Sequence, residues 1–120
     1  MARTKLVKHI LKLYIPIWDE NIEVCFTSDL VKVWKKYEPK EPSIGECKGV
    51  FIVTDASKVI IIYQLPVTIN TIIHEISHAV DEVLLERGLN LNEDSSSEAK
   101  AYLMGFISEN ILKFYNTIEI

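Results

Sequence analysis

The chain has 120 residues, of which 48% are hydrophobic and 25% are charged. This is the composition of a folded globular protein rather than of a disordered one, and the length suits a single domain spanning residues 1–120. The formal net charge is −4 and the early basic residues are dispersed along the chain. Both features argue against a surface for nucleic acid or for an anionic membrane.

No segment of the sequence has the pattern of a membrane anchor or a signal peptide. The longest apolar run, Val59–Tyr63, is too short to cross a bilayer, and Lys8 and Lys12 interrupt the early apolar run that a signal peptide needs. We therefore expect a cytoplasmic protein. The two cysteines match no metal-ligand spacing and no disulfide framework, so we expect them to be reduced, buried or half-buried side chains: Cys25 and Cys47.

The first part of the chain predicts one ambiguous element, one strand and one short helix. Residues 5–18 fit the apolar pattern of a helix and that of a strand equally well. Residues 22–26 alternate apolar and polar side chains, which predicts a half-buried strand. Either Ser28 or Asp29 can cap a short helix over residues 30–37. Its expected inner face consists of Leu30, Val33, Trp34 and Tyr37.

The second part predicts a β-hairpin followed by two long helices. After a loop rich in proline and glycine, residues 50–54 and 58–65 read as paired strands joined through Asp55-Ala56-Ser57. The second strand is apolar on both faces, which predicts a central place in the sheet. Helices are expected over residues 68–87, ending before Gly88, and from about residue 96 to 115. Their expected inner residues are Ile69, Ile72, Ile73, Ile76, Val80, Val83 and Leu84 in the first, and Ala99, Leu103, Phe106, Ile107 and Ile111 in the second. Strands first and helices last predict an α+β fold.

The first long helix contains the sequence His74-Glu75-Ile76-Ser77-His78, which is an HExxH motif. Residues four apart lie on the same helix face, so both imidazoles can reach one metal ion. Glu75 is rotated by about 100° around the helix axis, where it can take a proton from water bound to the metal. Zn²⁺ is the expected metal, because imidazole and carboxylate ligands suit it and leave a position open for water.

A zinc site of this kind needs a third protein ligand, and Glu98 is the best candidate. It lies 20 positions after His78, near the start of the last helix, where an antiparallel return can bring it back to the motif. The alternative is that Glu98 completes a capping box with Ser95. Glu93 and Asp94 are the fallback ligands.

Two further residues share a face with the expected ligands. Asp81 lies about one turn beyond His78, where it either supports that imidazole or pairs with another neighbour. Tyr102 lies one turn beyond Glu98, and its hydroxyl either helps to hold an oxyanion or belongs to a buried structural tyrosine.

At these positions the chain resembles the gluzincins, the thermolysin-like branch of the zincins, including the spacing from the motif to Glu98. More closely, residues 71–81 and 98–103 are similar to minimal metallopeptidases common in phage and prophage genomes, which resemble the SprT-like and ImmA/IrrE-like zincins. The likeness covers roughly residues 48–115. Two departures are visible: Tyr102 stands where full gluzincins place an aspartate, and the large second domain is missing. Leu84 stands in place of the third histidine of the metzincins.

The resemblance implies a minimal zincin fold, in which a mostly antiparallel sheet of three or four strands packs on two long C-terminal helices with one short helix added. It also implies zinc, hydrolysis of a peptide bond in a protein or peptide substrate, and a bacterial or phage-infected cytoplasm. Two other functions stay open from the sequence. One is a zinc-containing binding module with little or no activity, and the other is a structural metal site that tethers the two helices.

Overall fold

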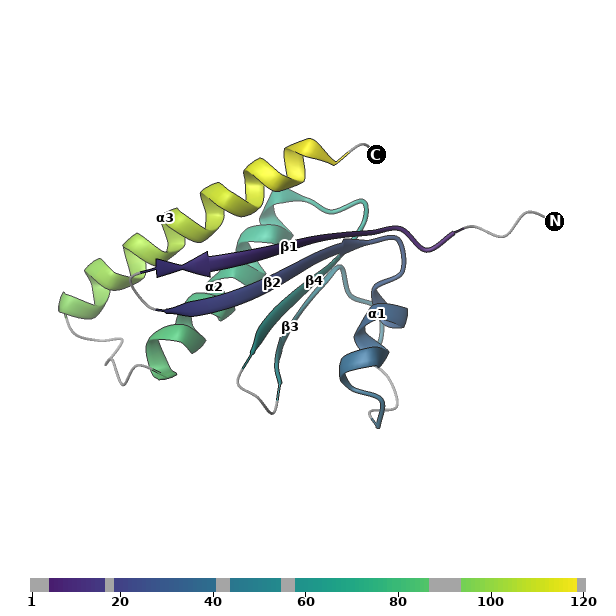
Figure 1. The fold of residues 1–120 in the computed structure, drawn as a ribbon, viewed down its shortest axis with the longest axis horizontal. Coiled ribbons are helices and arrows are strands. Elements are labelled where there is room, and N and C mark those ends of the chain that lie inside the picture. Colours follow the sequence, from purple (N-terminus) through teal and green to yellow (C-terminus); the bar gives the residue numbers. More distant parts are fainter. Residues whose placement is uncertain (1–4, 17–18, 41–43, 55–57, 87–93, 119–120) are drawn as a thin grey trace.

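The structure is a computed structural model that describes residues 5–16, 19–40, 44–54, 58–86 and 94–118, the side chains of residues 94–97 excepted. Its elements in chain order are β1 (Lys8–Ile15), β2 (Glu20–Thr27), α1 (Leu30–Tyr37), β3 (Gly49–Val53), β4 (Val59–Gln64), α2 (Ile69–Glu86) and α3 (Asp94–Thr117). Helices α2 and α3 cover one face of a four-stranded sheet, and α1 packs on the other (Figure 1). The expected α+β architecture is confirmed.

The strand order in the sheet is β1-β2-β4-β3. The β1–β2 and β3–β4 pairs are antiparallel, whereas β2 and β4 run parallel, so the sheet is mixed and mostly antiparallel. The predicted hairpin and the central place of β4 are both confirmed, since residues 59–63 are buried on both faces. The ambiguous N-terminal segment is a strand, because it pairs with β2 over its whole length. The hairpin turn at residues 55–57 lies outside the described residues.

The expectation that residues 22–26 form a half-buried strand is wrong, because the whole run 22–27 is buried. Helix α1 covers the face of β2 that was expected to meet water. The acid on that face, Glu23, is only 8% exposed. It accepts a hydrogen bond of 2.8 Å from the hydroxyl of Tyr37 and lies 3.6 Å from the ammonium of Lys58. Burial and this hydrogen bond raise the pKa of Tyr37 to about 12.

The short helix has the predicted bounds, and Asp29 caps it by accepting a hydrogen bond of 3.1 Å from the backbone N–H of Lys32. Helix α2 begins one residue later and ends one residue earlier than expected, and α3 begins at Asp94. Gly88 lies outside the described residues. Of the expected inner residues, Ile69 is wrong, because it is 61% exposed.

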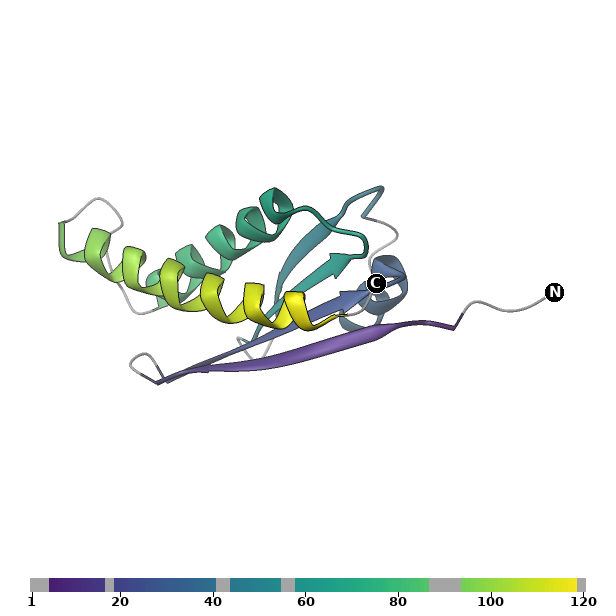
Figure 2. The same cartoon turned by 90° about the horizontal axis from the view of Figure 1, so that it is seen from above.

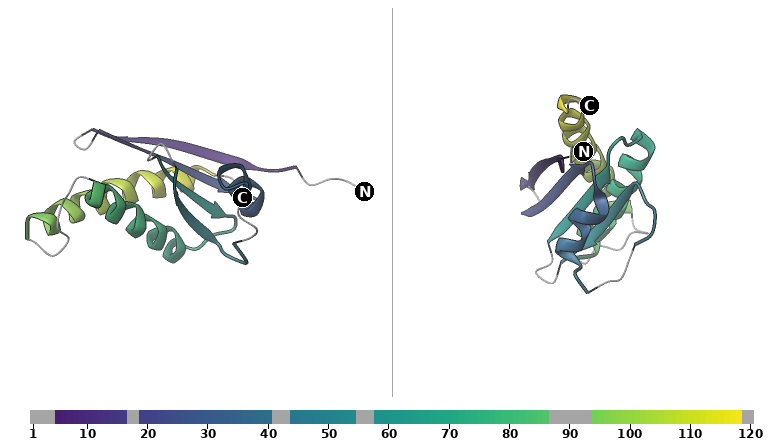
Figure 3. Two further views of the ribbon diagram at one scale, coloured as in Figure 1. Left: turned by 90° about the horizontal axis from the view of Figure 1, so that it is seen from below. Right: turned by 90° about the vertical axis from the view of Figure 1, so that its right-hand side faces the viewer.

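The core has two parts, one on each face of the sheet. Helices α2 and α3 bury their apolar stripes against one face, with these helix residues at its centre: Ile72, Ile76, Val80, Val83, Leu84, Leu103, Ile107 and Ile111. Figures 2 and 3 show α3 running alongside β1 and α1 lying apart from the two long helices. Cys25 is buried under α1 and Cys47 is half-buried, both as free thiols, as expected. Within the described part of the chain, no helix has the length and apolar character to span a membrane.

Candidate metal centre

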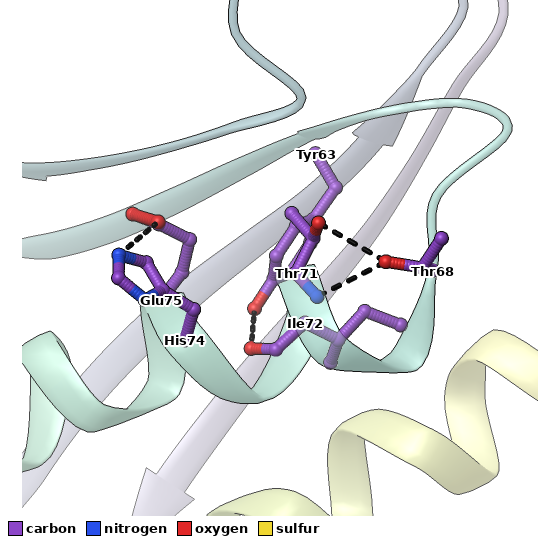
Figure 4. A network of polar contacts seen from close by, with 6 residues as sticks. All are labelled: Tyr63, Thr68, Thr71, Ile72, His74 and Glu75. Atoms are coloured by element: carbon purple, nitrogen blue, oxygen red, sulfur yellow. Dashed lines mark hydrogen bonds and ion pairs between the residues drawn. The ribbon is translucent and has the colours of Figure 1, made fainter.

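Two sets of hydrogen bonds hold the start of α2, and one of them joins it to the sheet (Figure 4). Thr68 acts as the cap, since its hydroxyl oxygen accepts a bond of 3.2 Å from the backbone N–H of Thr71. The hydroxyl of Tyr63, at the centre of the sheet, donates a bond of 2.6 Å to the carbonyl of Ile72. This second bond joins the helix turn that leads to His74 to strand β4.

The structure brings the three residues of the motif together as metal-ligand donors. The ring centroids of His74 and His78 are 4.9 Å apart with the ring planes at 82°. The Nε2 atom of His74 lies 3.9 Å from a carboxylate oxygen of Glu75 (Figure 4). One donor atom from each of the three residues lies within 4.8 Å of the other two. Two imidazole nitrogens and a carboxylate oxygen at these distances suit zinc chemically, whereas calcium takes oxygen ligands and copper(I) prefers sulfur.

The side chains of His74 and Glu75 differ sharply in their exposure to solvent. The side chain of His74 is 68% exposed, whereas Glu75 is only 8% exposed. The burial of Glu75 comes from β3, because a Cβ atom built on Gly49 would lie 2.9 Å from Cγ of Glu75. The ring of Phe51, further along β3, lies 6.1 Å from the ring of His78. Strand β3 thus forms one wall of the site and leaves little room around the Glu75 side chain.

The sequence motif alone does not identify the residues of this wall. The wall comes from Gly49 and Phe51, which precede the motif by more than twenty positions. A glycine at the head of a strand is a known sign of close backbone approach, and this was the available signal for Gly49.

The negative charge of Glu75 is felt by two neutral groups around it. Burial, and after it the charge of Glu75, raises the pKa of the Tyr63 hydroxyl well above its usual range. The same two causes raise the pKa of the Cys47 thiol. Both groups therefore stay protonated at neutral pH.

The structure does not bring Glu98 into this group. Among the residues that the structure describes, only His74, Glu75 and His78 form a cluster of metal-ligand donors, and Glu98 is exposed near the start of α3. The alternative capping role involves Ser95, whose side chain lies outside the described residues, as do Glu93 and the side chain of Asp94. The ligand role and the capping role of Glu98 both stay predictions.

The two other residues have neighbours on α3. A carboxylate oxygen of Asp81 lies 3.1 Å from the ammonium of Lys100, which is the pairing with another neighbour that the sequence left open. A supporting role of Asp81 towards His78 stays a prediction. Tyr102 is 42% exposed and stacks on Phe106 with ring centroids 6.1 Å apart. The expectation that Tyr102 is a buried structural tyrosine is therefore wrong, whereas an oxyanion role of its hydroxyl stays a prediction.

No protein-family model, no curated protein sequence and no solved structure matches this chain.

Proposed function

We propose that this protein is a zinc-dependent hydrolase of the minimal gluzincin type that cleaves a peptide bond. The observation that carries the proposal is the convergence of two exposed imidazoles and one buried carboxylate on α2. His74 and His78 would hold the ion, and Glu98 is the third ligand that we propose. A bound zinc ion supplies a Lewis acid that polarises a carbonyl and lowers the pKa of a bound water to about 7.

The role of Glu75 follows from its burial and its neighbours. Because β3 limits the space around its side chain, the carboxylate is held beside the two imidazoles rather than free in solvent. An anionic carboxylate in that place accepts the proton of the attacking water and returns it to the leaving nitrogen of the substrate. We assign Glu75 as the general base and acid of the reaction.

We also propose that the protein works in a reducing cytoplasm. Both of its cysteines are free thiols in the structure, and disulfide bonds are rare in that compartment.

A zinc-containing binding module is the second candidate. The exposure of His74 and the position of Glu98 outside the donor cluster favour it, because both leave the site more open than a working catalytic centre needs. Such a module would bind zinc through the same histidines but would turn over no substrate.

The substitution Glu75→Gln separates the two candidates, because it keeps the shape of the side chain and removes its basicity. We expect zinc stoichiometry to be unchanged and peptide hydrolysis to fall by about 10²–10⁴-fold, the usual contribution of a general base. Glu82→Gln, on the same helix, is the matched control and should keep full activity. If the zinc-loaded wild type cleaves nothing in a broad peptide library, the binding module is the better description.

Metal binding itself is tested by zinc titration of three variants. We expect His74→Ala and His78→Ala to lose high-affinity zinc binding, because each removes one of two imidazole donors. Glu98→Ala should weaken zinc binding at least tenfold if this residue is a ligand. Zinc affinity unchanged in Glu98→Ala would assign this residue to the helix cap instead.

A further inference from the structure

Strand β1 is a long and regular edge of the sheet. It pairs with β2 over all eight of its residues in an uninterrupted register, and its other side meets no strand within the described part of the chain. The strand contains no proline, and the continuous register shows no bulge. Proline and bulges are two devices that keep an edge strand from pairing with another chain, and a third device, lysine, is present at Lys8 and Lys12. The backbone of β1 is therefore open to a further strand, provided that the charges of that strand suit these lysines.

The groups presented at this edge follow from the hydrogen-bond pattern. The carbonyl of Val7 accepts a bond of 3.0 Å from the backbone N–H of Ser28. In this antiparallel ladder the odd-numbered residues of β1 therefore direct their backbone N–H and C=O groups to β2. The even-numbered residues therefore direct their backbone N–H and C=O groups to the free edge: Lys8, Ile10, Lys12 and Tyr14. Ile10 and Tyr14 are each 47% exposed.

The edge is basic at its beginning. Lys8 lies close to Lys36 of α1, and contact with the ammonium of Lys8, followed by its charge, lowers the pKa of Lys36. The charge of Lys32, also on α1, adds to this effect. Three lysines that are far apart in the sequence thus gather beside the first residue of β1.

The edge is mainly acidic at its other end. The hydroxyl of Tyr14 donates a hydrogen bond of 2.9 Å to the carboxylate of Asp19. Asp19 and Glu20 line one surface cleft with Lys12, and the two other charged residues of this cleft, Glu23 and Lys58, lie 3.6 Å from each other. A strand with opposite charges at its two ends is complementary to itself in antiparallel pairing, because the basic end of one copy meets the acidic end of the other.

We propose that two copies of this chain associate through β1, antiparallel about a two-fold axis at Leu11, so that one sheet runs through both copies. In this register Lys8 lies opposite the partner's Tyr14, and Ile10 lies opposite the partner's Lys12. The two neighbouring registers place Lys8 opposite the partner's Lys12 or set the two Lys12 residues against each other, and like charges in direct opposition are unfavourable. This association is independent of the proposed hydrolysis.

Analytical ultracentrifugation of the full chain over the micromolar to submillimolar range tests the proposal. We expect a monomer–dimer equilibrium whose dissociation constant rises with salt. Lys8→Glu should raise the dissociation constant about tenfold, because it places an acid at the acidic end of the partner on both sides of the axis. Lys113→Glu makes the same charge change on α3, where the lysine pairs with Glu109, and should leave the dimer intact.

Single-cysteine variants test the register. In a Cys47→Ala background, which removes the half-buried thiol, Leu11→Cys should form an intermolecular disulfide on mild oxidation, since the two Leu11 residues face each other across the axis and Cys25 is buried. Preferential cross-linking of Ile10→Cys or Lys12→Cys would overturn the register. A monomer at every concentration, or a dimer that Lys8→Glu does not weaken, would overturn the association. A monomer that instead binds poly-glutamate would show that the edge takes an acidic partner rather than a second copy.

Discussion

Gly49 sets how closely β3 approaches the carboxylate that we assign as the catalytic base. A Cβ atom at this position would lie 2.9 Å from Cγ of Glu75, 3.2 Å from Cγ2 of Thr71 and 3.4 Å from Cδ1 of Tyr63. The first of these distances is too short for real carbon atoms, so a larger residue must displace the Glu75 side chain. The place of the carboxylate therefore depends on the absence of a side chain on the neighbouring strand.

Replacing this glycine gives a prediction for the site. We expect Gly49→Ala to lower peptide hydrolysis by about 10–100-fold, because a displacement of the base by about 1 Å costs that much. Zinc stoichiometry should be unchanged, since the three atoms nearest to the new methyl group belong to Glu75, Thr71 and Tyr63 and not to a histidine. Gly105→Ala is the matched control: no atom lies within 4 Å of its Cβ, and full activity is expected. Full hydrolysis in purified Gly49→Ala would contradict a positioning role for this glycine.

The sequence predicts individual residues well only where local geometry decides their place. His74 and His78 share a face because helix geometry requires it, and the structure brings their rings together. The burial of Glu75 depends on β3, which comes from another part of the chain, so the helix pattern could not predict it. The position of Glu98 depends on how α3 returns along α2, which sequence spacing alone does not determine.

Helix α2 is joined to the sheet by one buried hydrogen bond near its first turn. The hydroxyl of Tyr63, a fully buried residue of β4, donates to the carbonyl of Ile72 at 2.6 Å. The ring of Tyr63 also stacks on Phe26 of β2, with centroids 4.9 Å apart. One side chain thus connects two strands with the helix that carries the candidate metal centre.

Removal of that hydroxyl should destabilise the fold measurably. We expect Tyr63→Phe to lower the free energy of unfolding by about 0.5–1.5 kcal/mol, the usual net value of one hydrogen bond. Urea denaturation of both proteins measures the difference. Tyr102→Phe, at an exposed position of α3, is the control and should change the free energy by less than about 0.5 kcal/mol. Equal stabilities of Tyr63→Phe and the wild type would show that the helix is held by apolar packing alone.

At the level of elements, the sequence predicts what is local and misses what depends on pairing. The helices and the β3–β4 hairpin follow from periodicity and from turn residues, and the structure has them within a few positions. The N-terminal segment was ambiguous because its apolar residues fit both periods, and pairing with β2 makes it a strand. The parallel pairing of β2 with β4 joins strands separated by α1 and β3, so no local pattern reports it.

The whole molecule has an apolar core on each face of its sheet, and the smaller core contains a thiol. Cys25 is 3% exposed and packs under α1 with Leu30, Val33 and Trp34. Because α1 covers Cys25, β2 is buried on both faces, contrary to the half-buried strand expected from the alternating sequence. A thiolate in this place would lack the hydration that it has in the unfolded chain, which makes the fold sensitive to alkaline pH.

Alkaline titration of the whole fold tests this sensitivity. Burial raises the pKa of the Cys25 thiol from 9.0 to about 11, although the charges of Lys8 and Lys36 partly oppose it. Between these values the unfolded chain has lost a thiol proton that the folded chain keeps, so the free energy of unfolding falls as pH rises through this range. Below pH 9 the contribution of this thiol is fully present. We expect urea denaturation of Cys25→Ala to show a shallower fall from pH 9 to 11 than the wild type. Cys47→Ala, which removes a half-buried thiol, should change the slope less. Parallel profiles for Cys25→Ala and the wild type would mean that the Cys25 thiol ionises equally in the folded and unfolded chains.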